Sequence, residues 1–269
     1  MSSGFHRPSM GVLNLQSGEK KFQLSRHTPS DDIGFFVKHF WIVSWNLTDE
    51  EPYLQDVVPN PCVNLVIENQ RSAIFGPATQ KYSYFLQHKG CVFGAKFKPG
   101  GFYPFIKRPV SALREQPLSI ASVFDIEAQH WEESILTQSD ERSMVEIAER
   151  YMRPKLPAQD RRIPMIQRMI ERIVEDKEIT KVDQICEHFD MNKRTLQRLF
   201  DQYVGVSPKW VIKLYRIQNA AETMDHHPNQ DWLQLSLDLG YYDQSHFIKD
   251  FKSIIGKTPD EYTKGTRQP

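Results

Sequence analysis

A pattern of apolar residues occurs twice in the C-terminal part of the chain. In the first stretch of each copy, four apolar or small residues recur 50 positions later: Val182, Ile185, Cys186 and Phe189 correspond to Trp232, Leu235, Ser236 and Leu239. After a turn that is one residue longer in the second copy, the offset becomes 51, so that Phe200 corresponds to Phe251. Each copy ends in a Gly-x-Ser/Thr-Pro stretch, at 205–208 and 256–259, which stops one helix and starts the next. The repeat predicts two helix-turn-helix units.

The second helix of the first copy carries side chains suited to reading DNA bases. Asn192 is placed to cap a helix that begins at Lys193. The residues predicted to face inward are Leu196, Leu199, Phe200 and Tyr203. This spacing leaves an outer face made of Arg194, Gln197, Arg198 and Asp201. Because arginine pairs with guanine and glutamine with adenine in the major groove, this face favours DNA recognition over a merely solvated helix face.

Charge supports this interpretation locally, although the whole chain is neutral. The 269 residues contain 34 Lys and Arg and 34 Asp and Glu, which excludes a polycation that coats nucleic acid indiscriminately. Between residues 191 and 216, however, six basic residues, among them Lys209 and Lys213, oppose only Asp201. From Asp225 onward, seven acidic residues outnumber five basic ones. We therefore expect the first unit to contribute more DNA affinity than the second.

These residues resemble the AraC/XylS family of transcriptional regulators. The resemblance covers about residues 161–263 and is most specific in LGYYDQSHFIKDFKSIIGKTPDEY (239–262), while NKRTLQRLFDQYVGVSPKWVIKLYRIQNA (192–220) also fits. Tyr241 stands where the family usually has Phe. The resemblance implies two helix-turn-helix units joined by a long helix over about 208–225, which holds both recognition helices in successive major grooves of double-stranded DNA. By position, the implied base-reading residues are Arg194, Gln197, Arg198, Gln244, Ser245, His246 and Lys249, and Asn192, Lys193, Lys209 and Lys213 complete the predicted DNA-binding set.

A proline-containing segment divides the chain into two domains. The stretch Arg-Pro-Lys-Leu-Pro (153–157) breaks a helix and predicts an interdomain linker. We therefore expect a first domain over 1–155 and a DNA-binding domain over 160–269. Short runs rich in aromatic and β-branched residues occur in the first domain, at 40–47, 62–68 and 91–97. The predicted fold class is α+β, with a β-rich sheet or barrel and flanking helices followed by an all-α domain.

The first domain ends in a helical pattern over 141–152 that has an apolar seam. This seam could pair with a second subunit, or it could pack against the β-rich part of its own chain. The sequence favours neither alternative.

The first domain also resembles the sensor-like domains that accompany one subset of AraC-type regulators. The motifs that carry this resemblance are KHFWIVSW, VVPNPCVNLVIE, IFGPAT and GAKFKPGGFYPF. In that family such domains bind effectors or mediate oligomerisation. The candidate ligand-binding residues are Trp41, Trp45, Cys62, Phe97, Phe102 and Tyr103, with plain core packing as the alternative. Lys96 and Lys98 precede a Pro-Gly-Gly turn whose N–H groups could hold an anion, although turn chemistry explains the glycines equally well.

Other features narrow the function further. The three cysteines, Cys62, Cys91 and Cys186, are widely spaced, which argues against a disulfide framework or a zinc site. The chain lacks the Gly-rich nucleotide-binding motifs and the hydrolase Ser motif, which argues against an enzyme. We predict no metal, no cofactor and no catalytic residue. Because no apolar run is long enough for a membrane span or a leader, we expect a cytoplasmic protein without a membrane partner.

Three functions remain open at this point. The leading hypothesis is a transcriptional regulator that binds double-stranded DNA and is controlled by a small-molecule effector in the first domain. Alternatively, the first domain only dimerises. The third is an enzyme fused to a DNA-binding module, for which Cys62 is the conceivable nucleophile. RNA polymerase and a second copy of the chain are further candidate partners.

Overall fold

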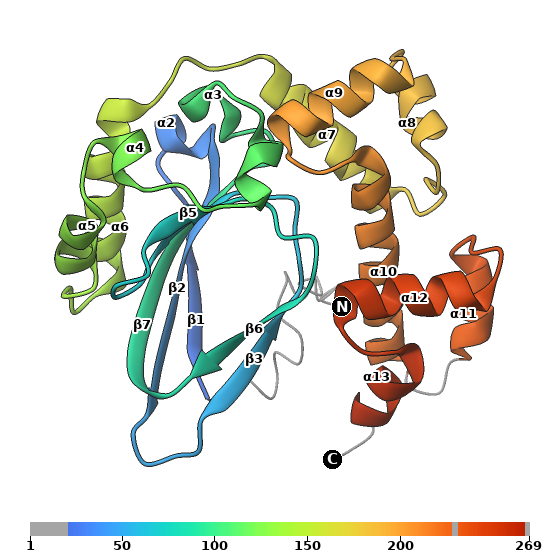
Figure 1. Cartoon of the computed structure of the whole chain (residues 1–269), viewed down its shortest axis with the longest axis horizontal. Coiled ribbons are helices and arrows are strands. Elements are labelled where there is room, and N and C mark those ends of the chain that lie inside the picture. Colours follow the sequence, from blue (N-terminus) through green and yellow to red (C-terminus); the bar gives the residue numbers. More distant parts are fainter. Residues whose placement is uncertain (1–20, 228–230, 267–269) are drawn as a thin grey trace, which may run out of the picture.

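The first domain is built on an antiparallel sheet (Figure 1). The computed structural model describes residues 21–227 and 231–266. The strands are β1 (Gln23–His27), β2 (Val37–Leu47), β3 (Tyr53–Val57), β4 (Asn64–Ile67), β5 (Ala73–Phe75), β6 (Tyr82–Leu86) and β7 (His88–Phe97). Five of them pair in the order β1-β2-β7-β4-β5, and β3 and β6 pair with each other as a separate two-stranded ribbon.

The sheet is open, so the barrel alternative of the predicted fold class is wrong for the described part of the chain, while the sheet is confirmed. Closing a barrel requires a continuous hydrogen-bond ladder between the two edge strands. Here β1 is one edge strand, and the outer edge of β5 is taken by a segment that is not a strand. Ile74 exchanges both backbone hydrogen bonds with Leu118, at 2.9 and 2.8 Å. Leu118 therefore occupies the edge that a closing strand would need.

Short helices cover one face of the sheet. They are α2 (Asp31–Gly34), α3 (Tyr103–Ile106), η1 (Val110–Arg114), α4 (Ala121–Phe124), α5 (Ala128–Ile135), α6 (Glu141–Met152) and η2 (Arg153–Lys155). Phe40 and Phe93 from the sheet are fully buried in one cluster with Trp131 of α5 and with Met144 and Met152 of α6. The apolar seam of α6 thus packs against its own domain, which decides between the two alternatives left open above.

The opposite face of the sheet is lined by tryptophans that lie flat over glycines. Trp41 pairs with Gly94 and Trp45 pairs with Gly90 across β2 and β7. A Cβ atom added at either glycine would overlap the indole ring of its partner. The two glycines are therefore required by close ring packing, because any larger residue would displace the ring.

The second domain consists of helices. They are α7 (Arg162–Glu175), α8 (Val182–His188), α9 (Lys193–Tyr203), α10 (Pro208–His226), α11 (Trp232–Asp238), α12 (Gln244–Ile255) and α13 (Pro259–Thr266). The predicted helix start at Lys193 is confirmed, α12 begins at Gln244, and the predicted long helix extends to His226. Two cores form, one around Phe200 from residues of α7 to α10, and one around Phe251 from residues of α10 to α13.

The duplication extends to individual hydrogen bonds in the two turns. The Met191 N–H donates to the Cys186 carbonyl at 2.9 Å. Fifty positions later, the Tyr241 N–H donates to the Ser236 carbonyl at 3.0 Å. These bonds close the ends of α8 and α11 in the same way.

The recognition helices begin with equivalent caps at the longer offset. The Asn192 side chain accepts from the Thr195 N–H at 2.9 Å. The Asp243 side chain accepts from the His246 N–H, also at 2.9 Å. The change of offset predicted from the longer turn is thereby confirmed, since the caps lie 51 positions apart.

The C-terminal end of α9 contacts the first domain. The rings of Tyr203 and Tyr103 have centroids 4.2 Å apart, and Gln202 Nε2 donates to the Tyr103 hydroxyl at 2.6 Å. Ile163 at the start of α7 is buried in the core of the first domain. The predicted division of the chain falls between η2 and α7, in the segment that leads into this contact.

The glycines that end the two recognition helices both abut the first domain. Gly205 and Gly256 have φ angles of 84°, which favours glycine. A Cβ atom at Gly205 would lie 2.9 Å from Val110 Cγ1 and 3.1 Å from Pro77 Cγ. A Cβ atom at Gly256 would lie 2.5 Å from Lys81 Cε. The backbone at the end of α9 therefore approaches the first domain more closely than a side chain would allow, whereas the neighbour of Gly256 is the flexible end of the Lys81 side chain.

Candidate nucleic-acid interface

The first recognition helix, α9, has a buried apolar face and, on its opposite side, an exposed polar face. Its buried residues are Leu196, Leu199, Phe200 and Tyr203, as predicted. On the opposite side, Arg194, Gln197 and Arg198 are exposed. These three side chains have long polar ends with several hydrogen-bond donors, which is what reading base edges requires.

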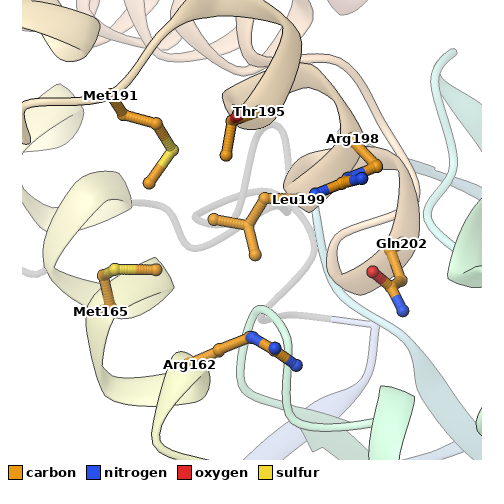
Figure 2. Close-up of a pocket in the computed structure, with 7 residues that line it drawn as sticks. All are labelled: Arg162, Met165, Met191, Thr195, Arg198, Leu199 and Gln202. Carbon is orange, nitrogen blue, oxygen red and sulfur yellow. The ribbon is translucent and has the colours of Figure 1, made fainter.

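Arg198 also borders a pocket between α7 and α9, with a volume of about 470 Å³. Figure 2 shows Leu199 at its centre, with the sulfur atoms of Met165 and Met191 on one side and Arg198 and Gln202 on the other. Arg198 thus lies at the edge of the outer face, whereas Arg194 and Gln197 do not line this pocket.

The second recognition helix, α12, has the same construction. Its buried residues are Phe247, Phe251, Ile254 and Ile255. The side chains predicted to read bases are exposed: Gln244, Ser245, His246 and Lys249. His246 Nδ1 lies 2.8 Å from a carboxylate oxygen of Asp243, the residue that caps the helix. The second face therefore carries an acidic group beside its first turn, which the first face lacks at the equivalent Asn192.

Two of the predicted DNA-binding residues are engaged in ion pairs. Lys193 Nζ lies 2.6 Å from Asp183 Oδ1, and this bond raises the pKa of Lys193. Both partners are well exposed, so a DNA phosphate can replace Asp183. Lys213 Nζ lies 3.2 Å from Asp250 Oδ1, and the Tyr241 hydroxyl donates to the same carboxylate at 3.3 Å. Lys213 therefore joins α10 to α12, while Lys209 is exposed at the start of α10.

Arg216 has a structural role that the sequence reasoning missed. Its guanidinium donates to the Leu239 carbonyl at the end of α11 and lies 4.1 Å from the centroid of the Tyr241 ring. It satisfies a carbonyl that the end of a helix leaves unpaired. No local signal in the sequence reveals this role, because the carbonyl partner of Arg216 lies 23 positions away.

Some of the basic side chains of the first unit therefore bind other parts of the protein and are not available to DNA. Of the six basic residues between 191 and 216, Lys213 and Arg216 hold α10 against the second unit. In the described ranges, Arg194, Arg198 and Lys209 form no ion pair. These three, together with Lys193 once a phosphate replaces Asp183, are the positive charges of the first unit that remain open to DNA.

The structure does not bring the candidate ligand-binding residues together around one cavity. Phe97 and Phe102 are fully buried in the core, with ring centroids 4.8 Å apart. Trp41 and Trp45 lie over their glycines on the opposite face, and Tyr103 faces Tyr203. Cys62 is buried, and burial raises the pKa of its thiol.

The Pro-Gly-Gly turn that follows β7 uses its own backbone groups. The Gly101 N–H donates to the Lys98 carbonyl at 2.8 Å, and the Lys98 N–H donates to the Phe36 carbonyl at the same distance. A Cβ atom at Gly101 would lie 2.4 Å from the carbonyl oxygen of Phe36 and 3.0 Å from that of Lys98. The close approach of these backbone atoms therefore explains the glycine. Turn chemistry is the better explanation of the motif. Among residues 21–227 and 231–266, no three His, Cys, Asp or Glu side chains come together as a metal site, and no helix is long and apolar enough to cross a membrane.

Comparison with known proteins assigns each domain separately. Residues 185–265 match a family described as a helix-turn-helix domain, and residues 25–119 match a domain of unknown function, DUF6597. An uncharacterised HTH-type transcriptional regulator from Haemophilus influenzae is 31% identical over 83 residues, 31% of this chain and 28% of that protein. The HTH-type transcriptional regulator MtrA from Neisseria gonorrhoeae is 30% identical over 107 residues, 39% of this chain and 34% of that protein. The chain thus matches about a third or less of these relatives' length.

Among solved structures, the chain is similar to ToxT from Vibrio cholerae. One ToxT structure is 15% identical, with a TM-score of 0.39, over 93% of this chain and 100% of that one. A second, described as bound to an unsaturated fatty acid, is 13% identical with a TM-score of 0.38, over 96% of each chain. The helix-turn-helix match at residues 185–265 falls on the duplicated units. The C-terminal part of this chain is therefore an AraC-type double helix-turn-helix domain, of the kind found in HTH-type transcriptional regulators.

Proposed function

We propose that this chain is a sequence-specific DNA-binding transcriptional regulator that uses both recognition helices. The observation that carries the proposal is that the two units repeat the same structure. Helices α9 and α12 begin with equivalent N-cap hydrogen bonds, and both expose a polar face. Helix α10 joins the two units with 19 residues. At about 1.5 Å per residue it is about 28 Å long, comparable to the ~34 Å between major grooves on one face of DNA.

The first test is selection of duplexes from a random pool by the full-length chain. We expect a recovered sequence with two half-sites about 10 base pairs apart, and an affinity that falls as salt rises. The double variant R194A/Q197A serves as the comparison, because it removes two exposed side chains and leaves the buried face of α9 unchanged. Equal retention of all duplexes by the wild-type chain would refute sequence-specific binding.

We further propose that an effector in the first domain controls the DNA-binding domain. The supporting observation is the contact of Gln202 and Tyr203 with Tyr103, which connects the end of α9 directly to the sensor-like domain. The proposal requires a cytoplasmic location, since the DNA lies there. RNA polymerase and a second copy of the chain are partners to be tested on the DNA complex, by adding polymerase and by measuring the mass of the complex.

The alternative of an enzyme fused to a DNA-binding module depends on Cys62. A nucleophilic cysteine needs a thiolate, which requires a lowered pKa and access from solvent. Cys62 is 6% exposed, and its burial raises the pKa. We therefore propose a non-enzymatic regulator. Rapid and selective thiol labelling of Cys62 at neutral pH would favour the enzyme instead.

A further inference from the structure

Three polar side chains form a row across the middle strands of the sheet, on the face opposite the short helices of the first domain. His39 of β2 pairs with Lys96 of β7, and Lys96 pairs with Asn64 of β4. Side chains alternate between the two faces of a strand. The neighbours of Lys96, which are Ala95 and Phe97, are buried in the helix-covered core, so Lys96 points the other way. The same alternation places His39 and Asn64 beside it.

Positive charge gathers around this row. Burial lowers the pKa of His39 to about 3, and the charges of Lys96, Arg26 and Lys38 lower it further in the same direction. Burial also lowers the pKa of Lys96, and Lys38 and Arg26 add to this effect. Lys96 is therefore held in a partly buried position close to other basic side chains, beside a histidine that stays neutral.

The described part of the chain supplies no carboxylate to this site. Among the described residues, no ion pair includes Lys38, His39 or Lys96. Charged groups taken out of water are normally paired. An ammonium group in this position is therefore a receptor for an anion, with the Asn64 amide as a further polar neighbour that already donates to the Cys62 carbonyl at 3.4 Å.

The site lies where the sheet meets the long helix of the second domain. Tyr215 of α10 is a neighbour of Cys62, and burial raises the pKa of its phenol. Val58, in the segment that leads to Cys62, is buried among residues of α10 and α12 such as Leu214 and Phe251. A ligand in this position would contact the element that sets the spacing of the two helix-turn-helix units.

An apolar surface adjoins the row. Trp41 lies two residues from His39 on the same face of β2, and its ring lies flat over Gly94. A molecule that places an acidic group against Lys96 can therefore place an apolar or aromatic body against the Trp41 ring.

We propose that His39, Lys96 and Asn64, next to Trp41, bind the carboxylate or phosphate group of a small organic anion, and that this anion is the effector of the regulator. The second half of this inference rests on the proposed DNA-binding function. The first half is a binding site that can be measured without DNA.

The test measures anion binding to the full-length chain by calorimetry and thermal unfolding. The probes are sodium benzoate, which has an aromatic body, and inorganic phosphate, which has none, each compared with sodium chloride at equal ionic strength. We expect saturable binding and a rise in Tm with benzoate, or with phosphate if the group itself suffices. In K96M the affinity should fall about tenfold or more, because a hydrogen bond to a charged group is lost. The matched control is K89M, which removes an exposed lysine from the same strand.

K96M removes an unpaired, partly buried charge, so it should fold and its Tm without anions should equal or exceed that of the wild type. Absence of saturable binding of both probes to the wild-type chain overturns the inference, and so does equal affinity in K96M, K89M and wild type. The same preparations are assayed for retention of the selected duplex. A chain that retains DNA but binds neither anion refutes this site and leaves the DNA-binding proposal standing, whereas the reverse result refutes the regulator and keeps the site.

Discussion

The guanidinium of Arg216 lies 4.1 Å from the centroid of the Tyr241 ring and donates to the carbonyl that ends α11. One side chain of α10 thereby contacts both the end of α11 and Tyr241 in the turn that follows it. A planar fork that stacks and donates at the same time is specific to arginine, because lysine carries a compact charge without a plane.

We predict that R216K destabilises the second unit although it keeps the charge. Loss of the stacked, carbonyl-bound guanidinium should cost about 1–3 kcal/mol. The measurement is thermal unfolding of the full chain, with R194K as the control, because Arg194 is exposed on α9. Indistinguishable unfolding curves for R216K and R194K would contradict the role assigned to Arg216.

Base reading by α9 predicts position-dependent losses. R194A or Q197A should reduce discrimination at individual base pairs by about 1–3 kcal/mol while affinity for unrelated duplexes changes little. Competition binding against a set of single-base variants of the selected duplex measures this. A uniform loss over the whole set for R194A would make Arg194 a phosphate contact.

Replacing Lys209 and replacing Lys213, both on α10, should have different effects on DNA binding and on stability. K209A should lower the slope of log affinity against log salt by about one unit, because an exposed phosphate contact is lost. K213A should leave that slope unchanged and lower the Tm, because Lys213 pairs with Asp250 between α10 and α12. Salt titrations of both variants decide the matter, and an equal change of slope would place Lys213 on the DNA as well.

Packing on the open face of the sheet predicts a large effect of one methyl group. G94A should destabilise the first domain by about 1–3 kcal/mol, since its Cβ would overlap the Trp41 ring. The control is G34A, whose Cβ would have its nearest neighbour at 3.7 Å, an ordinary contact. Both are compared by thermal unfolding, and a G94A curve that matches G34A would mean that Trp41 moves aside freely.

The buried position of His39 predicts a pH dependence of stability. The pKa is 6.5 in an unperturbed histidine and about 3 in the folded chain. Between these values the unfolded chain binds the proton and the folded chain does not, so stability is fully present above pH 6.5 and falls as the pH drops from 6.5 towards 3. The slope from this group is at most about 1.4 kcal/mol per pH unit.

Replacing the imidazole should therefore flatten the profile. We expect the Tm of H39Q to change less between pH 7 and pH 5 than the Tm of the wild type, both measured in chloride buffers without other anions. His88 is exposed at the start of β7, so H88Q is the matched control and should follow the wild type. Parallel profiles for wild type and H39Q would show that His39 does not carry the effect.

Local signals made the second domain largely predictable from the sequence. The starts of α9 and α12 follow from caps that act over three residues, Asn192 to Thr195 and Asp243 to His246. The buried faces follow from helical spacing, which a short window reveals. The repeat then supplied the relation between the two units without any long-range information.

The interactions that were missed join residues far apart in the sequence. Lys213 and Asp250 are 37 positions apart, and Arg216 and Leu239 are 23 positions apart. No local pattern distinguishes a lysine that binds phosphate from one that joins two helices. The open edge of the sheet was missed for the same reason, because the partner of Ile74 is Leu118, from a segment with no strand pattern.

The segment from Pro77 to Lys81, between β5 and β6, adjoins the ends of both recognition helices. Pro77 contacts the first helix end at Gly205, and Lys81 contacts the second at Gly256. The ends of α9 and α12 thus lie against the same five-residue segment of the first domain. A change in the position of this segment would therefore reach both recognition helices rather than one of them.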